Sequence, residues 1–313
     1  MTLLINTITI VLPVFLVIGL GHLLRRLQLF DAAFVQQTNR LVYVIFLPLL
    51  LFYKIGKADF TNFFNGPLVI ASSLAIIFGF VLTYCYTGAR RYPAAQRGSF
   101  CQGAFRGNLA YVGLAICLNA YGDDGLTRAG ILMGFLVPVL NLFAILALLL
   151  PQQRNDTETG PNWLTQVALN PLIIASFLGV IWSYWQLPVP LIIDRALGIT
   201  SGLTLPLALL AIGGSFSLQR LKGDLWMAGM ASGVKLILLP LIAASLLVLF
   251  GVQGTDFGVG VLMAATPAAT ATYIMAEQLK ADSELAGSIV MLSTLTSAVS
   301  YTLILLLLNK AGI

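Results

Sequence analysis

Apolar residues run along this chain in ten long stretches that short polar connections separate. A helix that crosses a bilayer needs about 20 mostly apolar residues. The stretches cover residues 4–24, 34–55, 67–87, 98–120, 127–150, 163–185, 190–216, 225–250, 257–279 and 285–309. The pattern therefore predicts an all-α membrane protein with ten transmembrane helices.

Landmarks of the first half of the chain recur in the second half at an offset of 158 residues, or of 160 for the last pair named below. The matching features are Pro13 with Pro171, Gln28-Leu29 with Gln186-Leu187, Leu47-Pro48-Leu49 with Leu205-Pro206-Leu207, and Gly107 with Pro267. We expect two five-helix repeats, 1–150 and 163–313, joined by a cytoplasmic connecting loop at 151–162. Because five crossings is an odd number, the second repeat must be inverted relative to the first. Inverted repeats are typical of secondary transporters.

The positive charges predict how the chain is oriented in the membrane. Of 17 Lys and Arg residues, ten lie in or beside connections that follow odd-numbered stretches and five lie on the other side. The positive-inside rule then places the odd connections in the cytoplasm and both termini outside. No Lys or Arg precedes the first stretch, and Arg25 and Arg26 follow it, which is the reverse of a cleavable signal peptide. We expect the cytoplasmic (inner) membrane of a bacterium.

Composition excludes several classes of function. The chain is 58% hydrophobic and only 9% charged, whereas soluble domains carry about 25% charged residues. The sequence has no basic run with interleaved aromatic residues, which would favour nucleic acid as a partner. The lipid bilayer is the expected surrounding. The single His22 and the cysteines Cys85, Cys101 and Cys117, which lack C-x-x-C spacing, predict no metal site and no cofactor. The absence of a nucleophile–base pair and of a soluble output domain argues against an intramembrane enzyme or a sensor, so no catalytic residue is expected.

Helix breakers inside two matching stretches indicate the candidate site. The fourth stretch carries Arg106, Gly107 and Asn108 near its middle, and the ninth carries Thr266, Pro267 and Thr270. Broken backbone at membrane depth is tolerated only where protein or a polar cavity satisfies it. If both helices unwind there, the N-termini of the half-helices meet, and such termini favour anions. Pro138 and Asn141 of the fifth stretch could add a kink and a polar group.

The charged residues within the apolar stretches indicate the charge of the expected ligand. An arginine at membrane depth costs at least about 2.5 kcal/mol, so Arg106 is expected either to pair with an acid or to bind a ligand. Lys235 is the second cation within a stretch, and Glu277 is the only clear acid at depth. Two cations against one acid favour an anionic ligand. Pairing of Arg106 or Lys235 with Glu277, or an interfacial position for these residues, is the alternative.

Six segments resemble the auxin efflux carrier family, which includes bacterial and plant PIN-type carriers. They are FRGNLAYVGL (105–114), NPLIIA (170–175), LPLALLAIGGSF (205–216), KLILLP (235–240), TPAATATYIMAEQL (266–279) and STLTSAVSYTLIL (293–305). The resemblance implies that helices 4 and 9 break and cross at the substrate site. It also implies that helices 1, 2, 6 and 7 form a scaffold past which the others move as an elevator, and that a homodimer could form through the scaffold.

The same resemblance implies roles for individual residues. Asn108 matches an asparagine that contacts the substrate carboxylate in PIN-type carriers, and Pro267 matches the break of the ninth helix. Gly107 departs from the family pattern, since PIN-type carriers have proline there. Relatives that carry malonate and malate make a small carboxylate the expected substrate.

We therefore expect a carrier of small organic anions. The alternative is a sodium-coupled organic-anion symporter of the bile-acid-carrier type, in which carbonyls at the breaks would bind sodium.

Overall fold

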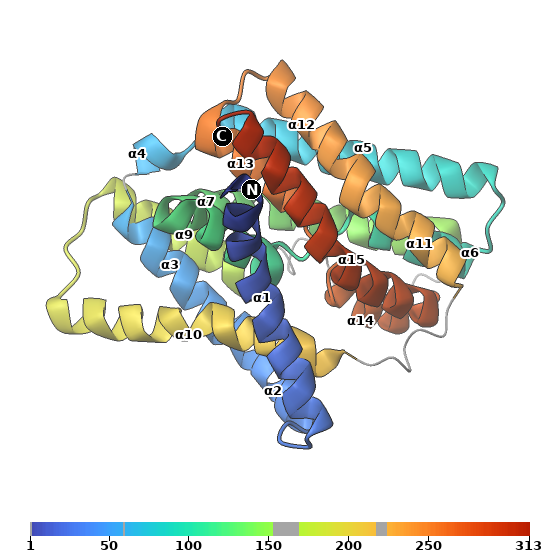
Figure 1. Cartoon of the computed structure of the whole chain (residues 1–313), viewed down its shortest axis with the longest axis horizontal. Helices are drawn as coiled ribbons and strands as arrows, with labels where there is room; N and C mark the ends of the chain where they lie inside the picture. Colours follow the sequence, from blue (N-terminus) through green and yellow to red (C-terminus); the bar gives the residue numbers. More distant parts are fainter. Residues whose placement is uncertain (1, 59, 153–168, 217–223) are drawn as a thin grey trace.

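The structure, a computed structural model, describes residues 2–58, 60–152, 169–216 and 224–313, and within these ranges it is helical with no strand. The helices (Figure 1) are α1 (Thr2–Arg26), α2 (Ala32–Leu41), η1 (Val42–Phe46), α3 (Leu47–Lys57), α4 (Phe60–Phe63), α5 (Gly66–Ala89), α6 (Ala94–Phe105), η2 (Leu109–Gly113), α7 (Leu114–Leu149), η3 (Leu150–Gln152), α9 (Pro171–Tyr184), α10 (Leu191–Ser215), α11 (Leu225–Gly233), η5 (Val234–Leu238), α12 (Leu239–Leu249), α13 (Gly254–Ala264), α14 (Ala271–Gln278) and α15 (Ser283–Lys310). Most of the connecting loop expected at 151–162, and the first residues of the stretch 163–185, lie outside the described residues.

Seven of the described helices are long and apolar enough to cross a membrane. The helical run Leu109–Gln152 has 44 residues, about twice the length that one crossing needs. Gly122 lies within this run with a φ of +64°, a left-handed conformation that glycine adopts without steric cost, so two helices meet there. The apolar helices α9 and α13 are shorter than a full crossing. The described residues thus show seven long candidates together with shorter apolar helices, and the count of ten crossings stays a prediction.

Capping side chains begin several helices at matching places in the two halves. Asn65 accepts a 3.0 Å hydrogen bond from the amide of Leu68 at the start of α5. Asp224 accepts a 2.9 Å bond from Trp226 at the start of α11. Such side-chain acceptors satisfy amides that have no partner within the helix. The left-handed residues also recur in pairs at the spacing of the sequence repeat, namely Gln28 with Gln186, Arg91 with Gly251, and Gly122 with Lys280.

The helices form two groups that lie side by side (Figure 1). The first helix group consists of α1, α2, η1, α3, α9 and α10, in which α1 packs along α10 and α3 packs along α9. The second helix group consists of α5, α6, η2, α7, α11, η5, α12, α13, α14 and α15, in which α5 packs on α6 and α12, and α11 packs on α15. α7 also contacts α3 and α9, so it connects the two groups.

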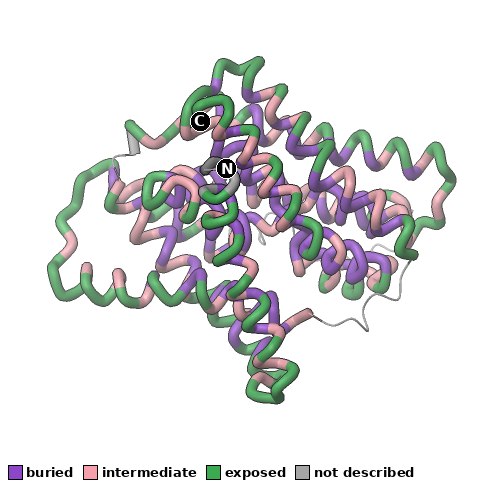
Figure 2. The backbone as a smooth tube through the Cα atoms, viewed as in Figure 1, coloured by how far each residue is buried: buried purple, intermediate pink, exposed green. Residues whose placement is uncertain are grey.

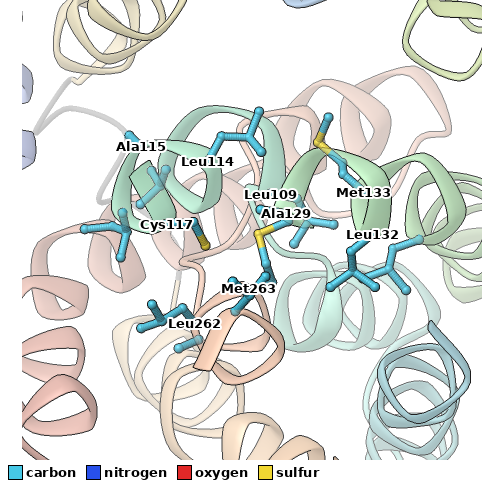
Figure 3. Packing of buried hydrophobic residues seen from close by; sticks show 14 of the residues in the cluster. Leu109, Leu114, Ala115, Cys117, Ala129, Leu132, Met133, Leu262 and Met263 are labelled. Carbon is cyan, nitrogen blue, oxygen red and sulfur yellow. The ribbon is translucent and has the colours of Figure 1, made fainter. Parts of the chain in front are cut away.

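Burial follows the distribution expected of a protein whose solvent is lipid. Large apolar side chains such as Ile192 on α10 and Leu249 on α12 are 84% and 77% exposed, and residues coloured as exposed run along the outer helices in Figure 2. The core lies where the breaks of α6 and α13 meet α7. In Figure 3, Met263 of α13 lies close to Leu109 of η2 and to Cys117 of α7, and all three side chains are buried.

Candidate functional site

Two broken helices meet in the middle of the second helix group. α6 ends at Phe105 and α13 ends at Ala264. The amide of Asn108 donates a 2.8 Å hydrogen bond to the carbonyl of Pro267, and the amide of Ala269 donates a 3.0 Å bond to the carbonyl of Arg106. These bonds make an antiparallel bridge between Gly107 and Ala268. We call residues 106–108 and 265–270 the crossover.

The residues at the centre of the crossover explain why it can form. Pro267 has no amide hydrogen, and its ring clashes with the preceding turn, so it kinks or breaks a helix. A Cβ on Gly107 would lie only 2.0 Å from the Thr266 hydroxyl oxygen, so no larger residue fits without movement. The backbone groups that each break frees are satisfied by the other break, which meets the requirement that buried amides and carbonyls be paired.

The crossover presents two helix N-termini on one side. Asn108 precedes η2, and its Oδ1 accepts a 3.3 Å bond from the amide of Tyr111. Thr270 precedes α14. No partner appears among the described residues for the Nδ2 of Asn108, which therefore remains able to donate. Helix N-termini carry partial positive charge and free amides, so this side of the crossover favours an anion.

A cavity of about 1500 Å³ separates the two helix groups at the crossover. One wall comes from α1, α2, η1, α9 and the end of α10, and the other comes from the crossover, α7 and α14. Side chains or backbone of these residues line it: His22, Arg25, Arg26, Ala32, Val35, Gln36, Asn39, Arg40, Tyr43, Arg106, Gly107, Asn108, Leu109, Ala110, Tyr111, Val137, Leu140, Asn141, Leu172, Gly214, Ser215, Phe216, Ala269, Thr270, Ala271, Tyr273 and Ile274.

Arg106 is the cation at the crossover end of this cavity. Its Nη2 donates a 3.0 Å hydrogen bond to Oδ1 of Asn141, and its Nη1 donates to the sulfur of Met275 at 2.6 Å. Neither partner is charged, and no carboxylate lies within ion-pair distance of Arg106 in the described parts of the chain. A guanidinium has five N–H donors in a planar fork that matches a carboxylate, so Arg106 retains capacity to bind one.

The structure separates the eight residues that the sequence singled out. Arg106, Gly107, Asn108 and Thr270 line the cavity. Thr266 and Pro267 are buried within the crossover, and the Thr266 hydroxyl donates a 2.9 Å bond to the carbonyl of Met263. Lys235 is buried behind the crossover and does not line the cavity, and Glu277 is exposed near the end of α14. Neither cation lies within ion-pair distance of Glu277, so the pairing alternative is not what the structure shows.

Sequence reasoning missed the polar residues of the opposite wall. Asn39 donates a 3.5 Å bond from Nδ2 to the hydroxyl oxygen of Ser215, and its carbonyl accepts one of 3.4 Å from the hydroxyl of Tyr111. The hydroxyl of Tyr43 accepts a 3.1 Å bond from Asn170. The polar run from Gln36 to Arg40 at the start of the second stretch was the available signal, but only the tertiary structure places it opposite the crossover.

Basic residues line the other end of the cavity. Arg25 and Arg26 end α1, and Arg40 is in the last turn of α2. Arg25 donates a 3.0 Å bond to the carbonyl of Phe30, while Arg26 and Arg40 are exposed. These charges raise the local concentration of anions at the entrance. In the described parts of the chain, no group of three or more His, Cys, Asp or Glu residues is placed to hold a metal ion.

The fold and this site together define a multi-pass membrane transport protein, because apolar helices broken at depth enclose a polar cavity. Residues 6–305 match the family described as "Membrane transport protein", and the chain belongs to this family, which is of the auxin efflux carrier type. The family and the relatives below are transporters, so the chain is a transporter and not an enzyme.

Three relatives illustrate the range of the family. An "Uncharacterized transporter" of Methanothermobacter thermautotrophicus is 27% identical over 94% of this chain and 95% of its own length. A "Putative malonate transporter" of Rhizobium meliloti is 23% identical over 97% of this chain and 96% of its own. "Auxin efflux carrier component 6" of Arabidopsis thaliana is 26% identical over 42% of this chain and 24% of its own.

Proposed function

We propose that this protein carries small organic anions, specifically carboxylates, by elevator-type alternating access, with the substrate bound at the crossover. The observation that carries the proposal is Arg106, whose guanidinium lines the cavity and has only the neutral partners Asn141 and Met275. The side-chain amide Nδ2 of Asn108 and the N-termini of η2 and α14 lie on the same cavity wall. Carboxylate oxygens satisfy all of these donors at once.

We propose that the chain forms ten transmembrane helices arranged as two inverted five-helix repeats, with helices 4 and 9 broken and crossing. The kink at Gly122 supports counting α7 as parts of two helices. The paired left-handed residues support the repeat. In this arrangement, the sequence-predicted scaffold helices 1, 2, 6 and 7 correspond to the first helix group. Formation of a homodimer through that group stays a prediction.

Within this proposal, the position of the cavity entrance indicates the side of the membrane to which the present conformation is open. Its entrance is lined by His22, Arg26 and Arg40, which lie in or near the connection between the first and second stretches. This connection is proposed to face the cytoplasm of a bacterial inner membrane, with both termini outside. The conformation is then open to the cytoplasm. The volume of about 1500 Å³ far exceeds what a small dicarboxylate fills, so we attribute selectivity to the donors at the crossover and not to the shape of the cavity.

The name of the Rhizobium meliloti relative supports malonate as the first substrate to test. Purified protein in liposomes should take up labelled malonate, malate or succinate faster than empty liposomes, and faster than it takes up indole-3-acetate. Arg106→Gln should lower uptake about tenfold to a hundredfold, because a lost hydrogen bond to a charged group costs about 1.5–3 kcal/mol. Arg106→Lys should retain part of the activity.

Arg90→Gln is the matched control, since Arg90 is exposed at the end of α5, away from the cavity. Uptake by Arg106→Gln at the rate of the parent would refute the site. No uptake of any carboxylate by the parent would refute the function. The alternative, sodium-coupled symport, predicts that uptake stops when sodium is removed from both sides of the membrane.

A further inference from the structure

Lys235 is a buried cation that the anion site does not use. It is 1% exposed and lies in η5, a π-helical turn inside the α11–α12 run. Such turns occur frequently at functional sites. A Cβ on Gly107 would lie 3.3 Å from the Nζ of Lys235, so the ammonium reaches the face of the crossover opposite the cavity.

The ammonium binds the end of a broken helix. Its Nζ donates a 2.6 Å hydrogen bond to the carbonyl of Ala264, the last residue of α13. In a continuous helix this carbonyl would accept from the amide of Ala268. That amide instead donates a 3.0 Å bond to the hydroxyl oxygen of Ser293. Lys235 therefore replaces the partner that the break removed.

This position has the electrostatics of a cation site. The C-terminus of a helix carries about half a negative charge, and the C-terminal ends of half-helices and unwound carbonyls bind the coupling cation in many transporters. No carboxylate lies within ion-pair distance of Lys235 in the part of the chain that the structure describes. The dipole of α13 therefore compensates part of the ammonium charge.

A small void beside Lys235 completes the environment. Its volume is about 20 Å³, and its lining includes Ser72, Gly107, Lys235 and Ala264. The hydroxyl of Ser72 is buried and has no hydrogen-bond partner among the described residues. The void has room for one water molecule. Removal of the lysine side chain would enlarge it, and the Ser72 hydroxyl and the Ala264 carbonyl would then be available as oxygen ligands.

We propose that the Lys235 ammonium is a tethered cation that occupies the place of a coupling ion, so that carboxylate transport by this protein needs no sodium. This inference rests on the proposed function, and it argues against the sodium-coupled alternative. It predicts that a cation from solution can replace the side chain once the side chain is removed.

Chemical rescue tests the proposal. In liposomes whose buffers contain N-methylglucamine in place of sodium, the parent should take up labelled malonate at the rate seen in sodium chloride, within about twofold. Lys235→Ala should be slower by about tenfold to a hundredfold, since a buried carbonyl loses its donor. Sodium chloride or ethylammonium chloride should restore part of that rate. Lys235→Met fills the space without charge, so neither cation should restore its rate. Lys310→Ala, at the exposed end of α15, should behave as the parent.

A binding measurement makes the result independent of transport. Sodium or ethylammonium should raise the thermal unfolding midpoint of purified Lys235→Ala and should leave that of the parent and of Lys235→Met unchanged. If the parent carries no carboxylate, the proposed function fails, and this measurement still decides the role of Lys235.

Three outcomes would overturn the inference. The first is carboxylate uptake by the parent that requires sodium. This measurement needs only the parent, so it tests the inference even if Lys235→Ala does not fold. The second is a Lys235→Ala variant that transports at the parental rate without added cations. The third is a folded Lys235→Ala variant that neither cation stabilises or stimulates.

Discussion

The backbone amide of Asn108 donates a 2.8 Å hydrogen bond to the carbonyl oxygen of Pro267, and this bond joins two helix breaks that are far apart in the sequence. The same asparagine caps η2 through its side-chain oxygen. Asn108 thus has a structural role through its amide and Oδ1, and its Nδ2 remains for a ligand. The predictions that follow separate these roles.

Substitutions at Asn108 should divide stability from transport. Asn108→Asp keeps the capping oxygen and adds a negative charge toward the cavity. We expect a thermal midpoint close to that of the parent, and malonate uptake that falls by more than about tenfold, because the charge repels the substrate. Asn108→Ala loses the cap, which costs about 0.5–2 kcal/mol, so its midpoint should fall. An aspartate variant that transports at the parental rate would place the substrate elsewhere.

A methyl group on Gly107 should disrupt the crossover. A Cβ there would overlap the Thr266 hydroxyl, and overpacking of this kind costs about 1–3 kcal/mol. Gly107→Ala should lower both the thermal midpoint and the uptake rate. Combining it with Thr266→Ala, which removes the obstructing hydroxyl, should recover part of both. Gly202→Ala on α10, where no atom lies within 4 Å of the new Cβ, is the control and should be neutral.

The ion pair of Lys54 and Asp123 should favour the present conformation. It joins α3 of the first helix group to the kink of α7 at 2.6 Å, at the end of α3 distant from the cavity entrance. The test uses a Ser215→Cys variant, whose thiol lies in the cavity wall, in a chain where the exposed Cys85 is replaced by serine. Adding Lys54→Met should reduce labelling of this thiol, because the present conformation, in which the cavity is open, is then less populated. Since Asp123 is 73% exposed and exposed pairs contribute about 0.2–1 kcal/mol, we expect no more than about a fivefold change.

Salt and a second ion pair provide the controls for that experiment. Because salt screens exposed charges, the effect of Lys54→Met should vanish near 1 M salt. Lys57 and Asp194 form a 2.8 Å pair that joins α3 to α10 inside the first helix group, so Lys57→Met should leave labelling unchanged. Equal effects of the two substitutions would show that the Lys54 pair does not report movement between the groups.

Arg128 and Asp256 should contribute to stability more than the exposed pairs do. Their side chains are 21% and 14% exposed, with a 2.7 Å contact between α7 and α13. Asn65 donates a 2.8 Å bond to the other carboxylate oxygen. Removing one partner costs about 3–5 kcal/mol for a fully buried pair and about 0.2–1 kcal/mol for an exposed one. Because this pair is half-buried, Arg128→Met should lower the thermal midpoint below that of Lys57→Met. Arg128→Met with Asp256→Leu should recover part of the loss, and a double variant no more stable than Arg128→Met would contradict this.

The sequence alone determined the all-helical membrane class, the family resemblance and the position of both breaks. These features depend on local chemistry. Long apolar runs must be helical in lipid, and glycine and proline, here Gly107 and Pro267, are the residues that most weaken a helix locally. The sequence also indicated that buried positive charge exceeds buried negative charge, since Arg106 and Lys235 lie within apolar stretches.

Only the tertiary structure decided what each of these residues contacts. Arg106 and Lys235 looked equivalent in the sequence, yet they approach the crossover from opposite faces. Arg106 lines the cavity, whereas Lys235 binds the end of α13. Thr266 and Pro267 proved to be internal, and Asn39 and Tyr43 face the site from the other helix group. The reason is that spacing along a helix predicts which residues share a face, but not which distant helix packs against that face.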